Sequence, residues 1–550
     1  MLVIQKTKGV HFMGKGKLLS LVVLGALLMG LSVGPAAHSQ QGQSLTIAFD
    51  AADWTTGDPH FAAATQDRAI ADMVFNGLVR YKPGDITGFQ PDLATDWSQS
   101  EDGTVWTFNL RQGVMCHPWG DNDGYELTSE DVVYSLQKAA NSDSSAYAGE
   151  YANMTFEATG PYTVEVTLAE SLSEALLLPK LSDYSGGFIV CKQAVEDLGA
   201  QAFQTNPVGT GPFMFSNYNP QQEVTLAPNP DYFRGEPQLD EVTVRFMPNV
   251  SAREAGLDTG ELDVIEGPPE QPWVEKMEPK DNAVVEVFGP GETATLHFNM
   301  SREPFNDMDV RKGLAYCLDR QEVLTTIGSA VADPIYSPVP PVLAGGMTQD
   351  EAADAGLLYE VDRERARELL ADVTPLSFEV VISERASYLR PMQNIQSQLT
   401  QCGVRMSLRV VDHSSMHTLI REDINPIVLY IAWRPNADVF LTRFYHSDSI
   451  VVTGENPDTN FSHLGGVDAN GDGEVESLDA VIEEARTELD AANQTELWKQ
   501  AQTQILEMAV AHPFYIKKFV FARANDVDFG YELDSTLALY PQINELTTVQ

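Results

Sequence analysis

The chain has 550 residues, 43% of them hydrophobic, and its 79 acidic and 35 basic side chains give a formal net charge of −44. This negative charge excludes nucleic-acid binding by phosphate neutralisation and disfavours an anionic membrane surface. The hydrophobic fraction permits large buried cores, and the length indicates more than one lobe.

The first 39 residues are predicted to be a signal peptide that is cleaved near Ser39. Lys15 and Lys17 precede an apolar run over residues 18–31, and Ala37 and Ser39 are small residues at the −3 and −1 positions. The run is shorter than the roughly 20 residues of a membrane span. No Cys near the cleavage site offers a lipid anchor. We therefore expect a soluble protein that is exported to the periplasm.

The charge of the exported part is more negative still. The predicted signal peptide contains four Lys and no acidic residue, which leaves 31 basic against 79 acidic residues and a net charge of −48. Such a field can attract cationic ligands, although salt screens it beyond about 10 Å. We favour a second interpretation, in which the charge adapts an exported protein to saline or alkaline surroundings.

Strand and helix patterns alternate along the chain and predict an α/β fold. Alternating apolar residues predict strands at residues 106–110, 162–168 and 242–246. Thr128 is a predicted helix N-cap, with Asp131 in the capping-box position. Further helices are predicted at residues 362–370, at residues 392–401, and from 478 to a point before Pro513.

The stretch from Asn206 to Ile265 combines a VGTGP turn, an aromatic NPDYF motif and an LDEV strand. In this order it resembles the solute-binding proteins of peptide and nickel ABC importers, the extracellular family 5 type. Further motifs resemble that family in the same order. They are DPH (58–60), NGLV (76–79), PDLATDW (91–97), DGTVWTF (102–108), LTSEDVVYSL (127–136) and the FN and VRKGLAY segments between 298 and 316.

The resemblance implies a two-lobed periplasmic-binding-protein fold with a hinge between the lobes. Lobe I would hold residues 44–290, including an extra subdomain at about 97–205. Lobe II would hold residues 291–515, and residues 516–550 would return to lobe I. The implied function is that of a monomeric periplasmic subunit that captures a peptide or peptide-like solute in the interlobe cleft. It would deliver this solute to the permease of an ABC transporter.

The segment Trp433-Arg434-Pro435-Asn436-Ala437-Asp438 resembles the family's cleft segment of a Trp followed by acidic residues. The resemblance implies that Trp433 forms an apolar wall and that Asp438 pairs with a ligand amine, with Arg434 beside them. Asn436 stands where the family often has Asp, which weakens the case for a free peptide amine. Alternatively, Trp433 only packs at a strand end.

Two further groups are candidates for ligand contact. Peptide-binding relatives often place an Arg at the position of Arg390 to hold a carboxylate, and Arg385 lies close by in sequence. Either Arg could instead be a solvated partner of surface carboxylates. His413 and His417 share one face of a predicted helix, which suits a transition metal and leaves nickel or metal-chelate binding as an alternative. Two solvated His side chains are the interpretation that we favour.

The segment DANGDGEVESLD, residues 468–479, matches the spacing of an EF-hand calcium loop, and in its last position a dockerin loop. Gly473 stands where the turn is sharpest. The predicted Ca²⁺ ligands are Asp468, Asn470, Asp472, Glu474, Glu476 and Asp479. No entering helix is predicted before the loop, so a structural calcium ion is expected. An acidic turn without an ion is the alternative.

Four cysteines remain after export, and they allow two disulfides with three connectivities. The lobe assignment implied by the resemblance favours Cys116 with Cys191 and Cys317 with Cys402. Buried free thiols are the alternative.

An exported hydrolase or peptidase is the alternative function from a different class. The chain contains neither an HExxH nor a GxSxG motif. A site assembled from distant residues would leave no such motif, so this argument is modest. We predict a binding protein and not an enzyme.

Overall fold

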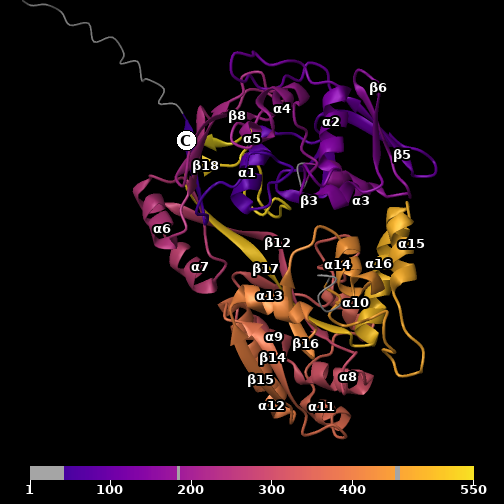
Figure 1. Cartoon of the computed structure of the whole chain (residues 1–550). Coiled ribbons are helices and arrows are strands. Elements are labelled where there is room, and N and C mark those ends of the chain that lie inside the picture. The colour runs from indigo at the N-terminus through magenta and orange to yellow at the C-terminus, as the bar shows by residue number, and fades with distance from the viewer. Residues whose placement is uncertain (1–42, 183–185, 452–458) are drawn as a thin grey trace, which may run out of the picture. The chain divides into compact units, whose positions relative to one another are not determined.

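The computed structural model describes residues 43–182, 186–451 and 459–550, so the predicted signal peptide lies outside the described residues. A nine-stranded sheet organises the described chain (Figure 1). Its strands, in spatial order, are β16 (Ile427–Ala432), β12 (Ala283–Phe298), β17 (Ala511–Ala524), β11 (Val264–Glu266), β1 (Ser44–Phe49), β10 (Glu241–Phe246), β9 (Glu223–Pro228) and β8 (Phe213–Asn219), with β13 (Ala332–Pro334) also paired to β17. β1 pairs in parallel with β10 and β11, and the other pairs are antiparallel.

The long strands β12 and β17 connect two hydrophobic cores. Phe288 on β12 and Phe521 on β17 belong to the first core, whereas Leu296 and Phe514 on the same two strands belong to the second. The register between the strands shifts after Phe288. These two strands therefore join the two lobes of an α/β fold.

The first core is covered mainly by the N-terminal half of the chain. A four-stranded sheet packs there, with Trp106 and Phe108 buried. Thr128 and Asp131 form the predicted capping box at the start of α2. The elements are α1 (Thr65–Val74), the hairpin β2 (Val79–Lys82) and β3 (Asp85–Pro91), β4 (Ala94–Gln99), β5 (Val105–Leu110), α2 (Ser129–Ala139), β6 (Thr155–Gly160), β7 (Thr163–Thr167), α3 (Glu174–Leu177), α4 (Lys192–Leu198), α5 (Ala200–Phe203), β18 (Val527–Asp528) and β19 (Thr548–Val549).

The second core lies between β12, β17 and a set of helices, and a parallel strand pair, β14 with β15, packs with them. Its elements are α8 (Met308–Cys317), α9 (Arg320–Thr325), α10 (Gln349–Asp354), α11 (Arg363–Leu369), β14 (Ser377–Ser383), α12 (Ala386–Gln401), β15 (Arg405–Val411), α13 (His413–Arg421), α14 (Ala437–Tyr445), α15 (Asp479–Thr487) and α16 (Ala491–Glu507). A smaller apolar cluster holds α6 (Val250–Thr259) and α7 (Gln271–Met277).

Two helix predictions differ from the structure. α12 begins six residues before the predicted start at Met392, because its first turns accommodate Pro391 inside the helix. The long helix predicted after residue 478 is broken into α15 and α16. At the break, Asp490 is the N-cap of α16 and accepts hydrogen bonds from the backbone of Ala492 and Asn493. Among the described residues, no helix has the length and apolar character needed to span a membrane.

Candidate functional site

A cavity of about 260 Å³ brings together residues that are far apart in the sequence. Its walls come from residues 268–272 before and at the start of α7, residues 326–327 after α9, residues 385–390 at the start of α12, and Lys517 on β17. Arg390 also lines an adjoining cavity of about 350 Å³. The cavity therefore combines the beginnings of two helices with one of the strands that join the two cores.

Positive charge dominates the walls of this cavity. Arg385, Arg390 and Lys517 line it, and Glu270 is the one carboxylate among its lining residues. Within the described part of the chain, neither guanidinium makes a hydrogen bond or an ion pair. Lys517 Nζ lies 3.7 Å from Glu292 Oε2, and only 16% of the lysine side chain is exposed. These three side chains suit a ligand that carries negative charge.

The positions of these cationic side chains on β17 and at the start of α12 explain why they line the cavity. Side chains alternate across a strand, so Lys517 reaches one face of β17 while Ile516 and Lys518 line a separate cavity of about 240 Å³. Gly291 allows the backbone of β12 to lie close to the backbone of β17 at Lys517, because a Cβ there would lie 1.3 Å from the carbonyl oxygen of Lys517. Arg385 is the N-cap residue of α12, so the positive end of that helix dipole also faces the cavity.

The Trp433 segment does not line this cavity. Trp433 follows the end of β16 and is half-buried, and its carbonyl accepts a 2.7 Å hydrogen bond from Arg434 Nη1. The Asn436 side chain caps α14 and accepts from Val439 N at 3.0 Å. The structure therefore gives Asn436 a structural role.

Asp438 has a partner within the protein. Its carboxylate accepts a 3.1 Å hydrogen bond from Arg486 Nε, and 15% of its side chain is exposed. Burial raises the pKa of Asp438, while the nearby Arg486 guanidinium opposes this shift. A ligand amine would have to share this carboxylate with Arg486.

The two histidines interact with each other. His413 Nε2 and His417 Nε2 lie 3.2 Å apart, and His413 Nδ1 lies 3.1 Å from Ser383 Oγ. Burial lowers the pKa of His417 to about 4, with the neighbouring His413 and Arg421 contributing. Two neutral imidazoles that share one hydrogen bond explain this geometry without a metal ion.

Three of the predicted calcium ligands converge. Asp468, Asp472 and Glu476 offer carboxylate oxygens within 4.8 Å of one another. Gly473 has a φ of 95°, which fits the sharp turn expected at this position. Asp479, the last residue of the loop, lies apart from these three, and its carboxylate accepts hydrogen bonds from the backbone and hydroxyl of Ser447.

The predicted ligands Asn470 and Glu474 also belong to this loop, and the buried side chain of Arg311 lies beside it. Asn470 Oδ1 accepts from Asp472 N at 2.8 Å, and Glu474 is exposed. The fully buried guanidinium of Arg311 donates to the carbonyl of Ala469, at the second position of the loop. Burial lowers the pKa of Arg311 to about 10, and its neighbours Asp468 and Glu476 oppose that shift. Arg311 therefore already places one positive charge beside the acidic loop.

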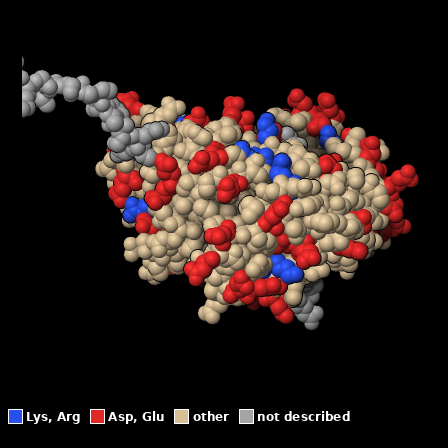
Figure 2. Space-filling model, turned by 90° about the horizontal axis from the view of Figure 1, so that it is seen from above, with Lys and Arg blue, Asp and Glu red and all other residues tan. Residues whose placement is uncertain are grey.

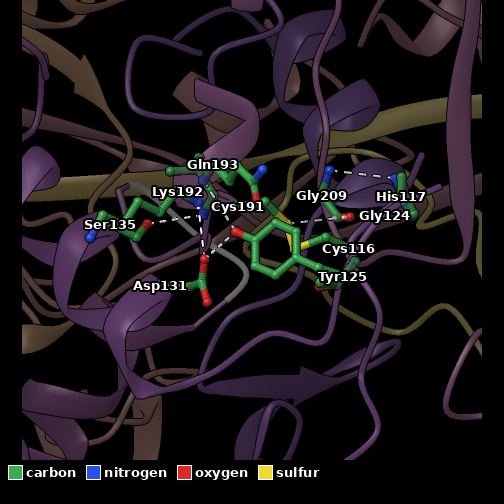
Figure 3. The surroundings of a disulfide bond; sticks show 12 residues. Cys116, His117, Gly124, Tyr125, Asp131, Ser135, Cys191, Lys192, Gln193 and Gly209 are labelled. Carbon is green, nitrogen blue, oxygen red and sulfur yellow. Dashed lines mark hydrogen bonds between the residues drawn. A yellow bond between two sulfur atoms is a disulfide. The ribbon is translucent and has the colours of Figure 1, made fainter. Parts of the chain in front are cut away.

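The structure contains the two disulfides favoured from the sequence, Cys116 with Cys191 and Cys317 with Cys402. Figure 3 shows the first of them, beside the hydrogen bonds that connect the start of α4 to α2. Asp131 accepts from Lys192 N at 3.1 Å and from the hydroxyl of Tyr125. The disulfide therefore ties the segment around Cys116 to the start of α4, and the Asp131 hydrogen bond from Lys192 N ties that same helix start to α2.

The sequence made Arg390 a candidate, with Arg385 noted as its neighbour, and gave no signal for Lys517 or Glu270, which line the same cavity. The alternation of YIKKF along β17 shows that its two lysines face opposite sides, but it does not show which one reaches a cavity. Glu270 follows two prolines and reads as a turn residue. Both residues become site candidates only when the fold brings the distant segments together.

Comparisons with known proteins agree over most of the chain. The family model of bacterial extracellular solute-binding proteins, family 5 Middle, matches residues 88–450. The di/tripeptide-binding protein 2 of Pseudomonas aeruginosa (strain UCBPP-PA14) is 26% identical over 519 residues, which are 89% of this chain and 93% of that protein.

Solved structures extend the likeness to the fold. The binding protein MoaA of A. tumefaciens R10, solved in complex with mannopinic acid, is 36% identical with a TM-score of 0.72. That comparison covers 92% of this chain and 100% of MoaA. HbpA2 from Haemophilus parasuis has a TM-score of 0.77 at 22% identity, over 92% of this chain and 100% of HbpA2.

Proposed function

The chain belongs to the bacterial extracellular solute-binding proteins of family 5, and we propose that it is the periplasmic solute-binding subunit of an ABC importer. In this role it captures a small peptide-like solute and delivers it to the permease in the membrane. The protein is exported with cleavage near Ser39 and works as a monomer.

One observation carries the proposal, namely the cavity walled by Arg385, Arg390 and Lys517. A guanidinium binds a carboxylate with two parallel hydrogen bonds, and the solutes named for the relatives, di/tripeptides and mannopinic acid, are compatible with such a contact. Arg390 is the proposed carboxylate clamp. The volume of about 260 Å³ accommodates one end of such a solute.

The Trp433 segment has a different part in this proposal. Trp433 lies outside the lining of this cavity, so the apolar wall that the family resemblance implies would contact a part of the solute that extends beyond it. Asn436 and Asp438 act mainly through the protein, because Asn436 caps α14 and Asp438 holds Arg486. Arg434 lies 5.0 Å from the centre of the ring of Phe444, in the last turn of α14.

The competing class is an exported hydrolase. Purified protein is incubated with a defined dipeptide and tripeptide mixture, separated from unbound peptide, and denatured, and the released ligands are identified by mass spectrometry. A binding protein returns intact peptides, and the same measurement on material purified without added peptide identifies any solute carried from the cell. Fragments that accumulate with time would overturn the proposal.

We also propose a structural calcium ion at the loop of residues 468–479. The convergence of Asp468, Asp472 and Glu476 supports it, since these like charges repel one another and Arg311 places only one positive charge beside them. Asn470, Glu474 through its backbone carbonyl, and water would complete the coordination. Asp479 would contribute only by leaving Ser447.

A further inference from the structure

The cavity beside α12 carries more positive charge than one carboxylate needs. Arg385, Arg390 and Lys517 face it, and Glu270 is the one acidic residue in its lining. This excess is unusual for a chain with 79 acidic and 35 basic side chains. Figure 2 shows how strongly Asp and Glu predominate over Lys and Arg on one face of the molecule.

The contrast with other cations in the chain is informative. Lys138 lies 2.8 Å from Asp58, Lys518 lies 2.6 Å from Asp333, and Arg486 lies 3.1 Å from Asp438. Within the described residues, Arg385 and Arg390 have no such carboxylate partner. Other arginines, such as Arg111 and Arg405, also make no ion pair within the described residues; what sets Arg385 and Arg390 apart is that both line one cavity with Lys517, where a ligand can supply the counter-charge.

The third cation is only partly neutralised. Glu292 Oε2 lies 3.7 Å from Lys517 Nζ, longer than a charge-assisted hydrogen bond of about 2.7–2.9 Å, and 42% of the Glu292 side chain is exposed. Lys517 can therefore turn a donor toward a ligand without losing a close internal partner. Against Glu270, the one carboxylate of the described lining, the three cations leave a formal charge of +2, which two negative charges on the ligand would balance.

Both negative charges belong at the same end of the ligand. The adjoining cavity that shares Arg390 contains no other cationic residue in its described lining and includes Glu275 together with neutral groups such as Gln321 and Ser329. Two acidic groups inside one cavity of about 260 Å³ match the α-carboxylate and the side-chain carboxylate of a single amino acid.

We propose that the solute ends in an acidic amino acid, glutamate or aspartate, whose two carboxylates contact Arg385, Arg390 and Lys517. This inference rests on the proposed function and narrows its ligand class. Lys517 is the specificity-determining residue, because it reaches the cavity from β17, whereas Arg385 and Arg390 come from the N-cap and first turns of α12. For the amine of the solute, Glu270 is the one acidic partner in the described lining of this cavity.

The test compares dipeptides that differ by one charge and hardly in shape. Alanyl-glutamate and alanyl-glutamine, and the matching leucyl and tyrosyl pairs, are titrated into the exported form of the protein by calorimetry. Each glutamate form should bind at least about tenfold more tightly than its glutamine form, because a hydrogen bond between charged groups is lost with the change. Lys517→Gln and Arg385→Gln should each reduce that ratio several-fold.

A matched control separates this site from general charge effects. Arg405→Gln removes an exposed arginine of β15, outside the cavity, and should leave the ratio unchanged. Circular dichroism and thermal melts check that each variant is folded.

The outcomes distinguish the two proposals. Equal affinity for both members of each pair overturns the acidic-terminus inference and leaves the proposed function standing. A preference for glutamate that survives in both cavity variants overturns the assignment to this cavity. If none of the six dipeptides binds, both the peptide-like ligand class and this inference fail.

Discussion

Removal of the Cys116–Cys191 disulfide should strongly destabilise the fold. The bond closes a loop of 75 residues. The loop-closure entropy of the unfolded chain then corresponds to about 4.5 kcal/mol at 25 °C, close to the measured range of about 2–5 kcal/mol for natural disulfides. Both cysteines are fully buried, so their replacement by Ala adds a cavity cost and avoids placing hydroxyl groups in the core.

The assay is equilibrium unfolding in urea, followed by tryptophan fluorescence, for the parent and the Cys116→Ala/Cys191→Ala double variant. The Cys317→Ala/Cys402→Ala variant is a matched comparison, since its bond closes a loop of 85 residues and predicts a similar loss. Thiol titration of the denatured, non-reduced parent should detect no free thiol. Four thiols per chain, or a loss below about 1 kcal/mol in both variants, would refute the reasoning.

Three further predictions concern calcium, pH and internal charge pairs. If the loop binds Ca²⁺ only when folded, a hundredfold excess of calcium over Kd stabilises the protein by about 2.7 kcal/mol. The Tm should therefore rise with calcium in the parent and not in Asp472→Ala. Identical melting curves with calcium and with chelator would mean that the loop is an acidic turn held by Arg311. His297 is buried, and burial lowers its pKa to about 3. Below pH 6.5 the unfolded state therefore binds a proton that the folded state does not. The free energy of unfolding falls as the pH is lowered from 6.5 toward 3, and the loss is about 2 kcal/mol at pH 5. His297→Phe should flatten that part of the pH dependence in urea unfolding, and an unchanged slope would contradict the assignment. Arg486→Met should destabilise α14 because it leaves the buried Asp438 without its charged partner, whereas Arg486→Met combined with Asp438→Asn should recover part of the loss in the same assay.

Local sequence patterns predicted the local structure well. The capping box at Thr128 and Asp131 and the alternating strand at residues 242–246 are confirmed, because both depend on residues a few positions apart. The start of α12 was wrong, since Pro391 reads as a helix start although it lies inside the helix. The α/β class followed from the alternation of strand and helix patterns, and the two-lobed form from the order of the family-like motifs along the chain.

The candidate site was predictable only in part. Arg390 could be proposed because the family resemblance implies a carboxylate contact at its position, and Arg385 because it lies close by in sequence. Lys517 lies 127 residues after Arg390 along the chain and reaches the same cavity only through the pairing of β17 with β12. The internal partner of Asp438 could not be read from sequence either, since Arg486 comes from a different helix.

The global and local charges of this protein act in opposite directions on an acidic solute. At long range, a net charge of −48 on the chain without its predicted signal peptide repels an anion, and this repulsion extends about 30 Å at 0.01 M salt but only about 8 Å at 0.15 M. At short range, Arg385, Arg390 and Lys517 attract it. The association rate of alanyl-glutamate should therefore rise several-fold between these salt concentrations, whereas attraction between opposite charges would make it fall. Stopped-flow tryptophan fluorescence measures this rate, with zwitterionic alanyl-glutamine as a control that should change little. A rate for alanyl-glutamate that falls as salt is added would mean that the positive cavity dominates the field far outside the protein, contrary to the charge distribution described above.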